Sequence, residues 1–196
     1  MKRWASLIVV GFTLAAFTLF APASSAQQRR ALGLHVRFDL PQILQNTVLT
    51  GGKDVGVDGP TGDTVELTGS GEFTPGIGNA AGGGTFVHKH SDGTEVAHGV
   101  WVVTGFATWR PGGGSLPSIL TDGIGEITET SAGIVALHVR LVPEGGESSL
   151  NAILEVHCHL PGASFDTEEG IRLIVGPFVF DQDPVLHGVT LFHILQ

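Results

Sequence analysis

Apolar and polar residues alternate along most of the chain with a period of two, which is the pattern of half-buried β-strands. No long stretch has apolar residues at the 3.6-residue spacing of a helix, and the 29 glycines and 10 prolines also disfavour helices. Glycine- and aspartate-rich sequence predicts loops over 50–63 and 111–126, and 40–46 predicts one short helical turn. The expected strands are 34–40, 65–74, 82–91, 94–109, 134–142, 150–160, 171–180 and 185–195.

This succession of strands without intervening helices predicts an all-β domain. Short connections that contain glycine or proline join most of the strands, as is typical of antiparallel folds. The pattern therefore predicts a single antiparallel β-sandwich or barrel of about eight strands. Both architectures satisfy the alternation equally well, because each of them buries one face of every strand.

The N-terminus has the features of a secretory signal peptide. Lys2 and Arg3 precede an apolar run over 5–20, and small residues over 21–26 suit a signal peptidase. We expect cleavage after Ala26, which divides the chain into a signal peptide (1–26) and one all-β domain (27–196). The expected location is secreted or periplasmic, and the alternative is an uncleaved N-terminal anchor.

Charge and cysteine content restrict the partners of the domain. The net charge is −9, and removal of Lys2 and Arg3 makes it more negative, which argues against nucleic acid and anionic membrane surfaces. Cys158 is the only cysteine, so the chain has no internal disulfide and packing must stabilise it. We expect a monomer that does not associate with a membrane after signal cleavage.

The Asp92-Gly93 pair predicts a tight hairpin in the middle of the chain. A type I′ turn with these two central residues would place His88 opposite Ala97 and His90 opposite Glu95. Residues i and i+2 of a strand project to the same side, so His88, His90 and Glu95 would share one face of the hairpin.

Two imidazoles and one carboxylate suit iron, manganese or zinc, so His88, His90 and Glu95 are a candidate metal site. The alternative is that the histidines are solvated and that Glu95 forms an ordinary cross-strand pair. The spacing Gly82-x5-His88-x-His90-x4-Glu95 resembles the first motif of the cupins, a resemblance that implies metal-dependent catalysis or binding. The chain departs from the cupin pattern at Val102, where a glycine is expected, and at Leu116, where a histidine ligand is expected.

A second candidate metal site lies on the strand predicted over 150–160. Glu155, His157 and His159 alternate on its polar face and form another set of two histidines and one carboxylate. The alternative is again a row of solvated side chains near the end of a strand. Cys158 points to the opposite face, so we expect a buried, inert thiol.

A longer set of short segments resembles uncharacterised secreted bacterial β-rich proteins. It comprises Gly82 to Phe86, Asp92 to Thr94, Gly99 to Trp101, Glu169 to Ile171 and Gly188 to Phe192. The resemblance implies a bacterial exported domain and no assigned activity.

The chain lacks a nucleophile elbow, a phosphate-binding glycine loop and a cysteine pair, so we expect no catalytic residue and no cofactor. The predicted function is a non-enzymatic β-domain that binds an unknown small molecule or an envelope partner. Two alternatives remain open. One is a cupin-like mononuclear metalloprotein, and the other is a barrel that carries a small apolar ligand.

Overall fold

A computed structural model describes residues 33–146, 148–183, 185 and 188–195. The prediction of an all-β fold is confirmed. The predicted count of about eight strands is wrong, because the described residues form fourteen strands and one 3₁₀ turn, η1 (Ile127–Glu129). The signal peptide predicted over 1–26 lies outside the described residues.

The strands are β1 (His35–Asp39), β2 (Pro41–Leu44), β3 (Val48–Gly51), β4 (Lys53–Asp58), β5 (Thr64–Thr68), β6 (Ser70–Thr74), β7 (Asn79–Lys89), β8 (Glu95–Gly113), β9 (Thr121–Asp122), β10 (Thr130–Pro143), β11 (Leu150–Cys158), β12 (Gly170–Val175), β13 (Phe178–Gln182) and β14 (Leu191–Leu195).

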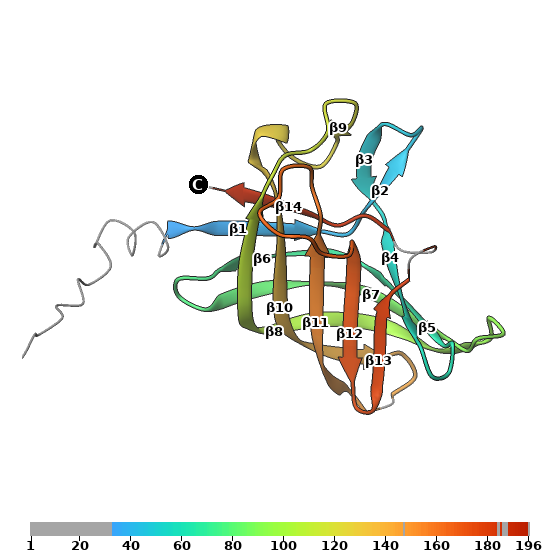
Figure 1. Ribbon diagram of the computed structural model, residues 1–196. Coiled ribbons are helices and arrows are strands. Elements are labelled where there is room, and N and C mark those ends of the chain that lie inside the picture. Colours follow the sequence, from blue (N-terminus) through green and yellow to red (C-terminus); the bar gives the residue numbers. More distant parts are fainter. Residues whose placement is uncertain (1–32, 147, 184, 186–187, 196) are drawn as a thin grey trace, which may run out of the picture.

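Eight of these strands close into a barrel. They pair in the order β4, β5, β7, β8, β10, β11, β12 and β13, and β13 pairs with β4 to complete the ring (Figure 1). All of these pairings are antiparallel. The sequence was compatible with both a sandwich and a barrel, and the closed ring of strand pairs identifies the barrel.

The barrel has two different ends. The connections β4–β5, β7–β8, β10–β11 and β12–β13 all lie at one of them, at the lower right of Figure 1, which we call the hairpin end. Toward the other end, β6, β1 and β14 form a second path of paired strands that joins β7 to β10. A small sheet of β2, β3 and β9 lies beside that second path.

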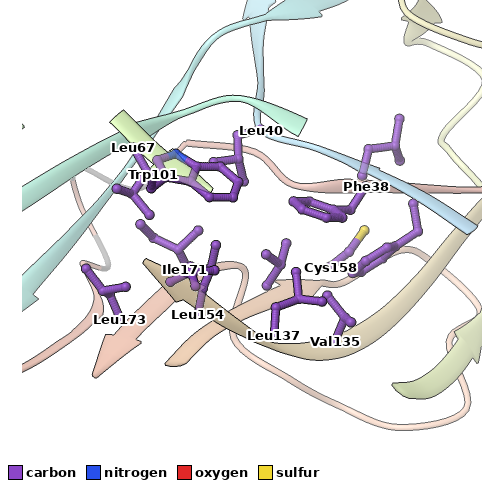
Figure 2. Close-up of a cluster of buried hydrophobic side chains, with 14 of the residues drawn as sticks. Phe38, Leu40, Leu67, Trp101, Val135, Leu137, Leu154, Cys158, Ile171 and Leu173 are labelled. Carbon is purple, nitrogen blue, oxygen red and sulfur yellow. The ribbon is translucent and has the colours of Figure 1, made fainter. Parts of the chain in front are cut away.

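The alternation of the sequence places one face of each strand in a continuous core. Side chains from β1, β5 and β8 face those from β10, β11 and β12 across the interior (Figure 2). Trp101 is the largest fully buried side chain, and its indole nitrogen donates a hydrogen bond to the carbonyl of Thr68 at 2.8 Å. Side chains therefore fill the middle of the barrel. Other fully buried members are Leu67, Leu137, Leu154, Ile171 and Leu173.

Glycines explain part of the difference in strand count. The stretch predicted as one strand over 65–74 is two, β5 and β6, separated by Gly69 at φ +128°. A Cβ on Gly69 would lie 2.3 Å from the carbonyl oxygen of Gly83, so only glycine allows this close approach. The stretch over 171–180 likewise divides into β12 and β13, and Gly176 between them has φ +56°.

Two other local predictions were wrong. The loop predicted over 50–63 contains β4, a full member of the barrel, and the helical turn predicted over 40–46 is mostly β2. β2 pairs with the adjacent β3, whereas β4 pairs with both β5 and the distant β13, a partner that local sequence cannot reveal. The residues described here contain no helix of the length and hydropathy needed to cross a bilayer.

Candidate functional site

The hairpin end of the barrel holds an apolar pocket of about 460 Å³. Inward-facing side chains of the barrel strands form its wall, and the β12–β13 connection forms part of its rim. Volumes of roughly 300–1,000 Å³ are typical of sites for small molecules. Apolar residues that line it include Val65, Phe86, Leu141, Leu173, Val175 and Phe180.

Small side chains on β8 leave the space for this pocket. Ala97 pairs with His88, and Gly99 pairs with Phe86 in the neighbouring strand. A Cβ on Gly99 would lie 3.0 Å from the Phe86 ring and 2.2 Å from a backbone oxygen of β10, so the ring packs directly against the glycine. The next inward residue of β8 is the buried Trp101. The barrel is therefore hollow beside Ala97 and filled beyond Gly99.

Two polar residues, His88 and Asn151, are among those that line the pocket, and Asn151 is exposed and pairs with Arg140 on the neighbouring strand. The His88 side chain is 21% exposed, and its ring lies edge-on to Phe180 at 5.4 Å between centroids. The Nε2 atom of His88 is buried and makes no hydrogen bond to any described residue. It lies 3.4 Å from Oδ2 of Asp63, which is close enough for electrostatic attraction.

Asp63 connects the first predicted pair of histidines. Its carboxylate accepts hydrogen bonds from Nδ1 of His90 at 3.1 Å and from the backbone N–H of Ser91 at 3.2 Å. His88 and His90 lie 6.3 Å apart between ring centroids, so both imidazoles approach the same carboxylate. This carboxylate comes from the β4–β5 connection, within the segment predicted as irregular.

Glu95 does not join the two histidines, so the predicted His90–Glu95 pairing was wrong. Glu95 pairs with Lys89 across a β-bulge, and its carboxylate accepts a hydrogen bond from Nδ1 of His98 at 2.7 Å. The cause is the turn. The N–H of Gly93 bonds the carbonyl of His90, and Gly93 alone has a positive φ, whereas a type I′ turn needs one at Asp92 too. The predicted His88–Ala97 pairing is confirmed.

The second predicted set of ligands is also divided. His157 Nε2 lies 3.4 Å from Oε2 of Glu155, whereas His159 lies beside Asp166 at 3.5 Å. Glu155 also contacts the guanidinium of Arg172 at 3.4 Å. Burial lowers the pKa of His157 and so favours its neutral form. Across the described part of the chain, no group of three or more His, Cys, Asp or Glu side chains is placed to hold a metal ion.

Cys158 is a core residue. It is fully buried, and this burial raises the pKa of its thiol well above the usual range. The prediction that Cys158 points into the core is confirmed, and a raised pKa favours the protonated thiol.

A buried charged cluster, which the sequence did not predict, lies at the other end of the barrel. His193 is fully buried, its Nε2 donates to Oδ2 of Asp122 at 2.7 Å, and its Nδ1 lies 3.4 Å from Oδ2 of Asp39. Burial alone would lower the pKa of His193, but hydrogen bonds to the two carboxylates outweigh it and raise the pKa. Arg37 donates to Asp39 and to the carbonyl of Ile124. The cluster therefore ties the 114–126 segment to β1 and β14.

A second pocket of about 410 Å³ lies between the 116–120 and 159–169 segments, and Glu169 lines it. Its carboxyl group accepts hydrogen bonds from the backbone N–H groups of His159 at 2.5 Å and Thr190 at 2.6 Å. Burial raises the pKa of Glu169. Both of its oxygens already have partners, so this group stabilises the fold around the pocket.

Comparisons with known proteins return no matching protein family, no matching curated protein and no matching solved structure.

Proposed function

We propose that this protein is a secreted or periplasmic binding protein that holds a small apolar molecule, without catalysis, in the pocket at the hairpin end. The observation that carries the proposal is the composition of the pocket. Thirteen of its fifteen lining residues are apolar, and the other two are His88 and Asn151. A concave, mostly apolar surface with few polar groups is the usual form of a small-molecule site.

The size of the pocket limits the ligand. At about 30 Å³ for each heavy atom, the volume share of a molecule in liquid water, the pocket accommodates on the order of 15 heavy atoms. The filled middle of the barrel, around Trp101 and Leu154, excludes a ligand that runs its full length. The proposal therefore concerns a compact ligand held at one end.

Fluorescence of N-phenyl-1-naphthylamine, an apolar probe that brightens in apolar surroundings, tests the proposal. Titration of the purified protein should give saturable binding with a Kd on the order of 1 μM. Ala97→Phe places a phenyl ring inside the pocket and should weaken binding at least about tenfold. Ala107→Phe makes the same change at an exposed position of β8 and should leave binding unchanged.

Circular dichroism of both variants should match that of the wild-type protein. Equal probe affinity in wild type, Ala97→Phe and Ala107→Phe would mean that the probe binds elsewhere on the surface, and it would refute the proposal. Absence of saturable binding to the wild-type protein would refute it as well.

A further inference from the structure

If the proposed function holds, the polar groups around the pocket restrict the kind of polar group that its ligand can have. His88 lines the pocket with a side chain that is 21% exposed, whereas its Nε2 atom is buried and lies 3.4 Å from Oδ2 of Asp63. The exposed part of this imidazole is a polar surface in an otherwise apolar wall, and covering it with a purely apolar ligand would cost free energy. A ligand atom that pairs with His88 therefore gains affinity beyond that of its apolar part.

Negative charge beside His88 disfavours an anionic ligand. Oδ2 of Asp63 lies 3.4 Å from Nε2, and Asp58 is a second nearby carboxylate, whose pKa is lowered chiefly by a hydrogen bond from Thr61 and to a smaller extent by His88. A ligand carboxylate that reached the imidazole would be brought close to both carboxylates in an apolar environment, where repulsion is weakly screened. A fatty acid is thus a poor match for this pocket.

A cationic ligand is disfavoured for a different reason. The carboxylates that could attract an ammonium group already accept hydrogen bonds from residues of the barrel. Asp58 accepts from Thr61 and Val179, and Asp63 accepts from His90 and Ser91. Neither aspartate lines the pocket. An ammonium group in the pocket would lose its hydration and find too few free acceptors.

We propose that the ligand is an apolar molecule that carries one uncharged hydroxyl group, and that this hydroxyl group hydrogen bonds to the imidazole of His88. A hydroxyl group is both a donor and an acceptor, so it suits either tautomer of neutral histidine.

Displacement of bound N-phenyl-1-naphthylamine by 1-decanol, decanoate and decylamine tests the assignment. These three molecules share a ten-carbon chain within the size limit of the pocket and differ in their polar end. At about pH 8, decanol should displace the probe at a concentration at least about tenfold lower than either charged molecule.

Variants of His88 show whether this residue causes the selectivity. His88→Phe keeps a ring of similar size, and it should weaken decanol about tenfold more than it weakens the probe. His88→Gln keeps a hydrogen-bonding group and should retain most of the preference for decanol. His138→Phe makes the same change as the first variant on the exposed face of β10, and it should behave as the wild type.

Two results would overturn the assignment while leaving the proposed function intact. One is tight probe binding that Ala97→Phe abolishes, together with equal or better displacement by decanoate or decylamine. The other is a preference for decanol that persists in a folded His88→Phe variant. If His88→Phe does not fold, the comparison of the three ligands on the wild-type protein still decides whether the polar group is uncharged. If the probe fails to bind the wild-type protein, the proposed function fails and the assignment fails with it.

Discussion

The two tryptophans of β8 allow a direct measurement of what one buried hydrogen bond contributes to this barrel. Trp101 is 1% exposed, stacks on Phe38 at 6.5 Å and donates to the carbonyl of Thr68. Trp101→Phe removes that hydrogen bond, which contributes about 1 kcal/mol. The smaller ring also leaves a void of roughly 40 Å³, which costs about 1 kcal/mol. We expect a total loss of about 2 kcal/mol in the free energy of unfolding.

Trp109 offers a matched comparison on the same strand. Its ring packs against Phe73 and Phe192 and covers Gly133, where a Cβ would lie 2.1 Å from the indole. Its Nε1 atom is buried and has no hydrogen-bond partner among the described residues. Trp109→Phe creates a similar void but also removes an unpaired donor, and these two effects oppose each other. The expected loss is about 1 kcal/mol or less.

Urea unfolding at equilibrium, followed by far-UV circular dichroism, gives both values. Equal slopes of the free energy against urea in wild type and variants would show that the denatured states are comparable. The melting temperature should fall by about 2–4 °C for each kcal/mol lost in a domain of this size. A loss in Trp109→Phe that equals or exceeds the loss in Trp101→Phe would refute the reasoning, because the hydrogen bond would then contribute nothing.

Burial and charge elsewhere in the barrel lead to three further expected outcomes. Leu154→Ala, at a fully buried position of β11, should cost about 3 kcal/mol in urea unfolding, whereas Leu150→Ala, at a position 49% exposed, should cost less than about 1; equal losses would contradict the filled interior. Because the pKa of His193 is raised, its contribution to stability should be complete below about pH 6.5 and be lost as the pH rises through the folded-state pKa. His193→Gln should reduce the loss of stability that the wild-type protein shows above about pH 6.5, and an unchanged loss would mean that another group causes it. The carboxyl carbon of Glu169, followed by NMR, should titrate above the usual value of about 4.3, and a lower value would contradict the burial of this group.

The period-two pattern predicted the class of the fold and most of its inward-facing residues. Alternation over 134–142 and 150–160 predicted strands that pair as β10 and β11, with Val135, Leu137 and Leu154 in the core. The pattern could not show that 53–58 is a barrel strand. That strand reads as a glycine- and aspartate-rich loop, and its partners lie in β5 and β13. Pairing of this kind is decided by tertiary contacts, which override local propensity.

The candidate site was only partly predictable for a similar reason. The sequence placed His88 opposite Ala97 correctly, since two residues on facing strands follow directly from the hairpin. It could not supply Asp63, because that residue comes from a different hairpin, 25 positions earlier than His88 in the chain. It assigned Glu95 to His90 because Asp92-Gly93 suits more than one turn. In the turn that forms, Gly93 alone takes the positive φ, and the bulge between His88 and Lys89 shifts the pairing beyond it.

The sizes of the inward-facing residues, more than their hydrophobicity, determine where this barrel is hollow. Along β8 the inward positions run Ala97, Gly99 and Trp101, so the space between the strands closes within four residues. The alternation of apolar and polar residues does not reveal this increase in size, because alanine, glycine and tryptophan can all occupy an inward-facing position. A sequence-based search for a binding site in an eight-stranded barrel should therefore compare the volumes of inward residues at equal heights on all the strands. In this chain such a comparison points to the hairpin end, where His88 is the polar group on the wall.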